Sequence, residues 1–128
     1  MAKGRYVDGF VIAVPKKNAA KYRKMAEFGK KIWMKYGALE YFECMGDDLH
    51  PKSMGGPKQL SFLKMAKAKT NETVWFSFIV FKSKKHRDEV NKKVMKDPSM
   101  NDQDWAKQPM PFDMKRFAYG GFKVMVGG

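Results

Sequence analysis

Asp8 is the first residue of the chain whose setting favours chemistry. It lies in the segment Arg5–Val14, where most of the other residues are apolar. A half-buried carboxylate needs a cation or several hydrogen-bond donors, because burial otherwise raises its pKa. Arg116 lies in the last apolar segment, which would neighbour the first strand in the sheet that the element order predicts. We predict that Asp8 either pairs with Arg116 or a lysine, or serves as a general base or a ligand anchor.

Two further apolar segments contain the other candidates. Glu43 and Cys44 are neighbours in the segment Leu39–Met45, so a strand would point their side chains to opposite faces. Nothing local to Cys44 supplies the base or the positive charge that a nucleophilic thiolate needs, and Cys44 is expected to be a small core residue. Ser77 lies inside the most apolar run, Thr73–Phe81. The predicted ligand-binding residues are therefore Asp8, Glu43, Ser77 and Arg116.

Other polar and glycine motifs favour structural roles. His86, Arg87, Asp88 and Asn91 lie within two turns at the start of one predicted helix. A positive charge is disfavoured at that end of a helix, so we expect a hydrogen-bond set or an interface there rather than a catalytic histidine. Gly120–Gly121 interrupts a predicted strand, which indicates close approach by a bulge, a partner subunit or a ligand.

The sequence gives no sign of a metal or an organic cofactor. One cysteine and two histidines, His50 and His86, are too few for a zinc cluster. A phosphate loop, a dinucleotide-binding fingerprint and a metal-binding helix motif are all missing from the sequence. No apolar run approaches the roughly 20 residues that span a bilayer, and the N-terminus lacks a signal-peptide segment. We expect no metal, no cofactor and no membrane partner, and a cytoplasmic protein.

Hydrophobic periodicity and helix-boundary residues define the elements that must position these side chains. Asn18 and Ser83 are good N-caps, and Gly37 is a good helix terminator. The long connection 49–71 has room for a short strand or helical turn within Gln59–Lys69. The predicted strands are Arg5–Val14, Leu39–Met45, Thr73–Phe81 and Lys115–Met125, and the predicted helices are Ala19–Tyr36 and Lys84–Lys96.

The order of these elements is strand–helix–strand, repeated once. It predicts an α+β fold of the ferredoxin-like βαββαβ type, with a four-stranded antiparallel sheet and both helices on one face, in a single domain over residues 1–128. The first and third strands carry apolar residues at both parities, so the sheet face without helices would be too apolar to stay in water. A second copy packed sheet to sheet would cover that face, and we predict a homodimer.

The charge is strongly positive. Lysine and arginine total 26 against 13 acidic residues, a net charge of +13, which favours contact with polyanions such as RNA. Only four of these cations are arginine, and lysine lacks the guanidinium fork that reads bases and phosphates specifically. We therefore expect any binding of nucleic acid to be non-specific.

Several short motifs in combination resemble a bacterial family of unknown function, the YbaA-like family, within the dimeric α+β barrel superfamily. The resemblance runs from Tyr6 to Val126 and departs from the family at Asp48–Leu60. It implies a ferredoxin-like protomer and a sheet-to-sheet dimer, but no reaction. The motifs that carry it include Tyr6–Phe10 (YVDGF), Val94–Pro98 (VMKDP), Met110–Asp113 (MPFD) and Tyr119–Phe122 (YGGF).

Three classes of function follow from these observations. The first is a homodimer with a small-molecule pocket between helices and sheet, acting as a ligand-binding protein or a cofactor-free enzyme of unknown reaction. The second is a basic protein that associates weakly and non-specifically with RNA. The third is a purely structural or interaction dimer. A pocket of several hundred Å³ lined by Asp8 and aromatic rings would favour the first class.

Overall fold

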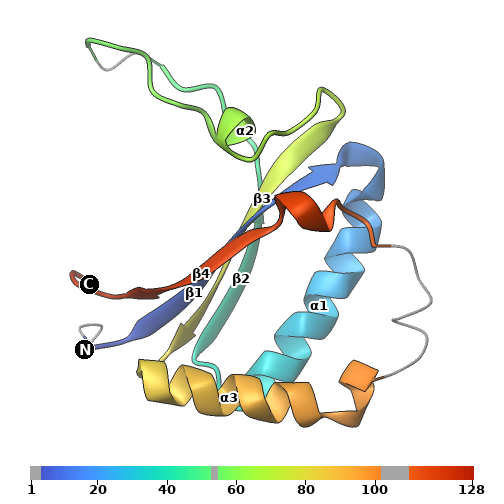
Figure 1. Ribbon diagram of the computed structural model, residues 1–128, viewed down its shortest axis with the longest axis vertical. Coiled ribbons are helices and arrows are strands. Elements are labelled where there is room, and N and C mark those ends of the chain that lie inside the picture. Colours follow the sequence, from blue (N-terminus) through green and yellow to red (C-terminus); the bar gives the residue numbers. More distant parts are fainter. Residues whose placement is uncertain (1–3, 53–54, 102–109) are drawn as a thin grey trace.

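Long apolar and β-branched runs form the sheet, and two amphipathic segments form the helices that cover it (Figure 1). The computed structural model describes residues 4–52, 55–101 and 110–128. The predicted α+β class is confirmed. The elements are β1 (Tyr6–Pro15), α1 (Ala19–Lys35), β2 (Glu40–Met45), α2 (Phe62–Met65), β3 (Glu72–Phe81), α3 (Lys84–Lys96) and β4 (Ala118–Lys123), with 3-10 turns at Lys16–Asn18, Pro98–Asn101 and Met114–Arg116.

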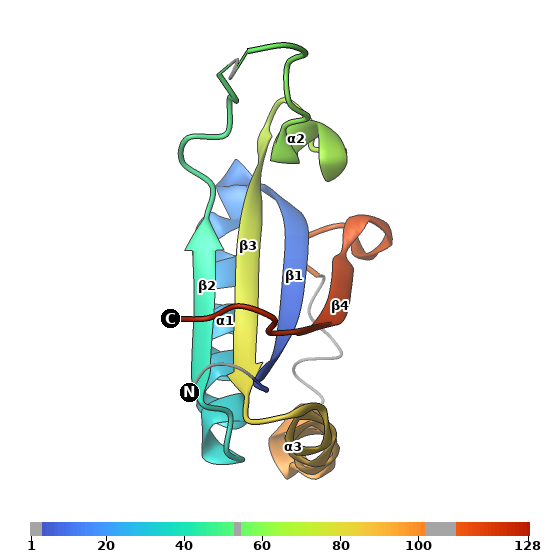
Figure 2. The same ribbon diagram turned by 90° about the vertical axis from the view of Figure 1, so that its left-hand side faces the viewer.

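In the described part of the chain the strands form one antiparallel sheet with the order β2-β3-β1-β4 (Figure 2). The register places Asp8 between Ile79 on β3 and Gly121 on β4. It also places Ser77 of β3 between Phe10 and Glu43. Because side chains alternate along a strand, Asp8, Ser77 and Glu43 all point to the same face of the sheet.

We call this side the helix face, because α1 and α3 pack on it. Its core joins Tyr6, Ile79 and Phe81 of the sheet to Ile32 of α1 and Val90 of α3. The opposite side, the open face, is covered at one end by α2, where Ala66 packs on buried Ala13 and Val74. Figure 2 views the open face, with α1 behind the sheet. Three exposed aromatic rings lie on the rest of the open face: Phe42, Phe76 and Phe122.

The helix boundaries follow from local hydrogen bonds. The Ser83 Oγ accepts from the His86 backbone N–H at 3.1 Å, which confirms Ser83 as the N-cap of α3. Gly37 ends α1 with φ of +110°, a conformation that glycine adopts without strain. Asn18 stands at the N-cap position of α1, but its amide donates to the Pro111 carbonyl oxygen instead of capping the helix.

The C-terminal strand is shorter than predicted. Lys115 and Arg116 belong to the 3-10 turn that precedes β4, because the Asp113 carboxylate accepts from the Lys115 backbone N–H at 2.9 Å. In the long connection, where the sequence leaves a short strand or a helical turn open, the structure forms the helix α2. The close approach at Gly121 comes from Tyr6 of the same chain, because a Cβ at position 121 would collide with the Tyr6 ring. Among the described helices, none is long and apolar enough to cross a membrane.

Candidate functional site

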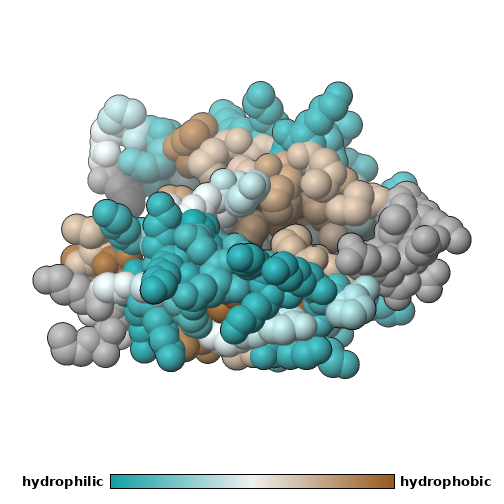
Figure 3. All heavy atoms as spheres, turned by 60° about the horizontal axis from the view of Figure 1, so that its bottom comes forward, coloured by the Kyte–Doolittle hydropathy of each residue, from teal (hydrophilic) through white to brown (hydrophobic). Residues whose placement is uncertain are grey.

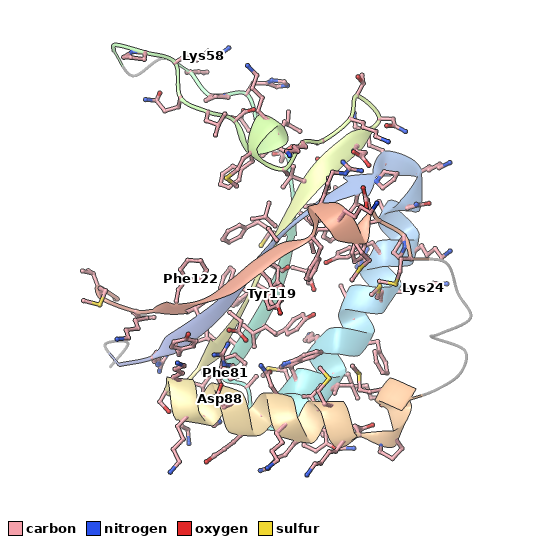
Figure 4. All side chains as sticks on the ribbon, viewed as in Figure 1. Lys24, Lys58, Phe81, Asp88, Tyr119 and Phe122 are labelled. Carbon is pink, nitrogen blue, oxygen red and sulfur yellow. The ribbon has the colours of Figure 1, made fainter. Side chains whose placement is uncertain are left out.

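A cavity of about 630 Å³ lies between α1 and the helix face of the sheet. Aromatic rings dominate its wall, contributed by strands, by α1 and by the segment before β4. Figure 3 shows an apolar area behind the hydrophilic side chains on the α3 side of the molecule, and Figure 4 shows Tyr119 of β4 in this part of the fold. The lining residues are Phe10, Ile12, Tyr22, Met25, Ala26, Phe28, Gly29, Trp33, Tyr41, Glu43, Ser77, Ile79, Met100, Met110, Phe112 and Phe117.

Glu43 is the centre of the polar part of this wall. The Tyr22 hydroxyl donates to Glu43 Oε1 at 2.8 Å, and the Tyr41 hydroxyl donates to Glu43 Oε2 at 2.7 Å. Tyr41 and Glu43 are two residues apart on β2, so they share a face, while Tyr22 reaches the carboxylate from α1. Buried Ser77, opposite Glu43 on β3, hydrogen-bonds to Tyr22. Four side chains from three elements thus form one connected network.

Both tyrosines stay protonated and act as donors. Burial raises the pKa of the Tyr22 hydroxyl far above its ordinary value of 10.0, and the negative charge of Glu43 adds to the effect. The same two causes, in the same order, raise the pKa of Tyr41. A tyrosinate beside this carboxylate would be strongly unfavourable. The network therefore presents a single carboxylate and neutral hydroxyls to the cavity.

Gly29 makes the approach of Tyr41 possible. It is buried in the middle of α1, and a Cβ added there would lie 2.6 Å from the Tyr41 Oη. Such a contact is too short for real atoms, so a larger residue would push the hydroxyl away from Glu43. A glycine in a helix interior costs stability, and here the backbone needs that small residue to let the β2 side chain in.

A second hollow, of about 600 Å³, lies between α1 and the edge strand β2 and shares Ala26, Tyr41 and Glu43 with the first. Glu43 therefore borders both hollows. Trp75 also lines the second hollow, and its buried indole Nε1 has no hydrogen-bond partner within the described residues. The Trp75 ring packs edge-on against Tyr22 at a centroid distance of 4.7 Å, next to the Glu43 network.

The predicted pairing of Asp8 with Arg116 is wrong. Asp8 is buried and pairs with Arg87 of α3, whose Nη1 lies 2.7 Å from Asp8 Oδ1. Asn91, one turn further along α3, also hydrogen-bonds to Asp8 and accepts from the Trp33 indole Nε1 at 2.9 Å. Burial raises the pKa of Asp8 despite the positive charge of Arg87. These side chains connect α3 to β1 and to α1. Asp8 does not line the cavity.

Arg116 has a different partner because the turn at residues 114–116 places it beside the start of β3. Its guanidinium donates two hydrogen bonds to the Glu72 carboxylate, with Nη1–Oε1 and Nη2–Oε2 distances of 2.6 and 2.8 Å. The same group donates to the Lys67 carbonyl oxygen and to Asp113 Oδ2. Hydrogen bonding to Arg116 lowers the pKa of buried Glu72. Arg116 thus connects the segment before β3 to the turn that precedes β4. It does not line the cavity.

Cys44 and His86 lie apart from the Glu43 network. Cys44 faces the opposite side of the sheet from Glu43, as predicted, but it is exposed and not a core residue. The His86 Nδ1 accepts from the Lys82 backbone N–H at 3.0 Å, and its ring packs edge-on against Phe81. Within residues 4–52, 55–101 and 110–128, no group of three or more His, Cys, Asp or Glu side chains could hold a metal ion.

Of the predicted candidates, Glu43 and Ser77 meet at the cavity, whereas Asp8 and Arg116 do not. Sequence reasoning missed the hydroxyls of Tyr22 and Tyr41. The available signals were the spacing of Tyr41 and Glu43, which puts them on one strand face, and Gly29 in the middle of an apolar helix stripe. The tyrosine on α1 gave no such signal, because aromatic residues at helical spacing usually form core.

Comparison with known proteins identifies relatives of the whole chain. It is 41% identical over 122 residues to the Uncharacterized protein YbaA of Escherichia coli K12, covering 95% of this chain and 97% of that protein. The YbaA proteins of Escherichia coli O157:H7 and Shigella flexneri match with the same identity and coverage. Residues 5–114 match the family described as "Protein of unknown function (DUF1428)". The chain therefore belongs to the DUF1428 family, whose function is unknown.

Proposed function

We propose that this protein binds a small, largely apolar molecule in the cavity between α1 and the sheet. The observation that carries the proposal is an aromatic-lined cavity of about 630 Å³ with one polar network, centred on Glu43, in its wall. Ligand sites in proteins have this volume and this composition, with a few polar groups that orient the ligand. Ser77 and the two tyrosines orient Glu43, so the carboxylate is the anchor or acid–base group of the site.

The experiment is native mass spectrometry of the protein purified gently from its host. We expect a retained small molecule on the wild type. Met25→Trp should abolish retention, because Met25 lines the cavity and the indole would fill part of it. Lys24→Trp is the matched control, since Lys24 is exposed on the outer side of α1 (Figure 4). Retention that survives Met25→Trp, or a wild type that neither retains a molecule nor is stabilised by small aromatic ligands, contradicts the proposal.

We also propose that the protomer is ferredoxin-like and that two copies pair through their open faces into a dimeric α+β barrel. The strand order β2-β3-β1-β4 supports this arrangement. Phe42 and Phe76 are 45% and 44% exposed, and both pack against Phe78 to form one aromatic patch. The chain after β4 projects on the same side of the sheet (Figures 1 and 2), and its Met125 and Val126 are exposed.

Light scattering at micromolar concentration tests the dimer, which needs about 1,200 Å² of buried surface to be stable. We expect a dimer for the wild type and a monomer for Phe76→Lys, because a charge would be buried in the interface. Met95→Lys, at an exposed apolar position on α3, is the matched control and should stay dimeric. A monomeric wild type would contradict the pairing. A cytoplasmic location stays a prediction that cell fractionation can test.

A further inference from the structure

The cavity wall has an uneven distribution of charge. Among the lining residues of the described chain, Glu43 is the one with a formal charge at neutral pH. Arg87, a partly buried cation on the helix face, is engaged by Asp8 and Asp88 and does not line the cavity. Both tyrosine hydroxyls are neutral. A ligand in the cavity therefore meets one negative charge and no positive one from these residues.

Glu43 also keeps capacity for a ligand. Each carboxylate oxygen can accept about two hydrogen bonds, and the network uses one on each oxygen, from Tyr22 and from Tyr41. The remaining lone pairs suit a donor, whereas a carboxylate or phosphate on the ligand would be repelled. Neither serine nor tyrosine in the network can offset that repulsion, because the hydroxyl protons of both tyrosines already point to Glu43.

The aromatic wall adds a second reason for the cavity to prefer a positively charged ligand. Trp33, Tyr41 and Tyr22 line the cavity beside Glu43, and the faces of such rings attract cations. Trp33 and Tyr41 lie 6.4 Å apart between ring centroids at a tilt of 39°, so two aromatic rings of the wall are neighbours. An ammonium group between aromatic rings and a carboxylate is a well-matched arrangement, because the ring faces and the carboxylate both stabilise positive charge.

We propose that the cavity selects an organic amine: a molecule with an apolar, ring-containing body and a protonated nitrogen that binds Glu43. This inference rests on the proposed small-molecule site and names the chemical class of its ligand. The net charge of the chain, +13, opposes the entry of cations and attracts anions. A preference for a cation must therefore come from the residues around the cavity and not from the electrostatic field of the whole molecule.

Three probes with nearly the same shape separate charge from hydrophobic fit: tryptamine (cationic), 3-ethylindole (neutral) and indole-3-propionate (anionic). Dissociation constants are measured by calorimetry or ligand-observed NMR on the full chain at about 150 mM salt, where long-range fields are screened. We expect tryptamine to bind about tenfold more tightly than 3-ethylindole, and indole-3-propionate to bind most weakly. This order needs no variant, so it tests the inference even if substitutions at Glu43 impair folding.

Glu43→Gln keeps the shape of the side chain and removes its charge. We expect it to reduce tryptamine binding about tenfold, to the level of 3-ethylindole, and to leave 3-ethylindole unchanged within about twofold. Glu89→Gln, an exposed position on α3, loses the same charge elsewhere and should change neither. Equal affinities of the wild type for tryptamine and 3-ethylindole would overturn the amine inference and leave the proposed function intact. Failure of all three probes to bind would overturn the amine inference, and it would overturn the proposed function only if the purified wild type also retains no small molecule.

Discussion

At the scale of single residues, Gly29 offers a sharp test because two effects of opposite sign meet there. Alanine in a helix interior is ordinarily about 1 kcal/mol more stable than glycine. At Gly29 the new Cβ would lie 2.6 Å from the Tyr41 Oη, and overpacking of this kind costs about 1–3 kcal/mol. We expect Gly29→Ala to be destabilising on balance in urea denaturation.

The matched background is Tyr41→Phe, which removes the hydroxyl and leaves the next ring atom at an ordinary 3.5 Å. In that background the same Gly29→Ala change should become stabilising by about 1 kcal/mol, because only the helix preference remains. An alanine effect of the same sign in both backgrounds would show that the Tyr41 hydroxyl does not approach Gly29.

Also at the residue scale, the buried carboxylates Asp8 and Glu72 should differ in how much stability the fold loses when the charge is removed. Burial outweighs Arg87 in raising the pKa of Asp8, so the ionised form of Asp8 is held at a cost. Hydrogen bonds from Arg116 lower the pKa of Glu72, so its ionised form is stabilised. We expect Glu72→Gln to cost about 3 kcal/mol at pH 7 and Asp8→Asn to cost less than about 1 kcal/mol. Equal losses in chemical denaturation would contradict this difference.

At the scale of elements, Asp97 connects the end of α1 to the end of α3. Its buried carboxylate accepts from the Ser99 backbone N–H at 2.9 Å and from the Tyr36 hydroxyl, and it pairs with Lys35 Nζ at 3.2 Å. Hydrogen bonds from Ser99 and Tyr36 hold the pKa of Asp97 well below its ordinary value of 3.8. The negative charge of Asp97 therefore stabilises the contact between the two helices.

The sign of the pH dependence follows from linkage. A carboxyl whose pKa is lower in the folded than in the unfolded chain stabilises the fold above its unfolded pKa and loses that effect as the pH falls. The Asp97 contribution is therefore complete at pH 6 and declines below the ordinary value of 3.8. We expect the Tm of wild type to fall more between pH 6 and pH 2.5 than the Tm of Asp97→Asn. Asp47→Asn, at an exposed loop position, should behave like wild type. Identical acid profiles for wild type and Asp97→Asn would exclude the role of Asp97.

At the scale of the whole molecule, the excess of lysine predicts weak contact with polyanions. Those of α1 and α3 lie on the outer sides of both helices, including exposed Lys24, Lys31, Lys84 and Lys92. Such a surface neutralises phosphates without reading bases, and counterion release makes its binding sensitive to salt. We expect RNA affinity to be similar for structured and random RNAs and to be lost by about 150 mM salt in filter-binding titrations. One RNA that binds far more tightly than a random pool would contradict this expectation.

The elements were predictable because their signals are local. The run Thr73–Phe81 is apolar enough to require a central strand, and Ser83 and Gly37 mark helix ends through bonds within a few residues. The predicted start of the last strand is wrong for a related reason. Apolar composition extends the strand to Lys115, whereas the Asp113 carboxylate closes a turn that takes Arg116 out of it.

The sequence by itself determined the α+β class, the main strands and helices, and the fact that Glu43 and Cys44 face opposite sides of the sheet. Tertiary structure alone decided the pairings: Glu43 with Tyr22 and Tyr41, Asp8 with Arg87, and Arg116 with Glu72. The periods of 2 and 3.6 that define strands and helices repeat within a few residues, so they are visible in the chain. The partner of a buried charge depends instead on strand register and helix docking, where a shift of one residue turns a side chain to the other face of the sheet.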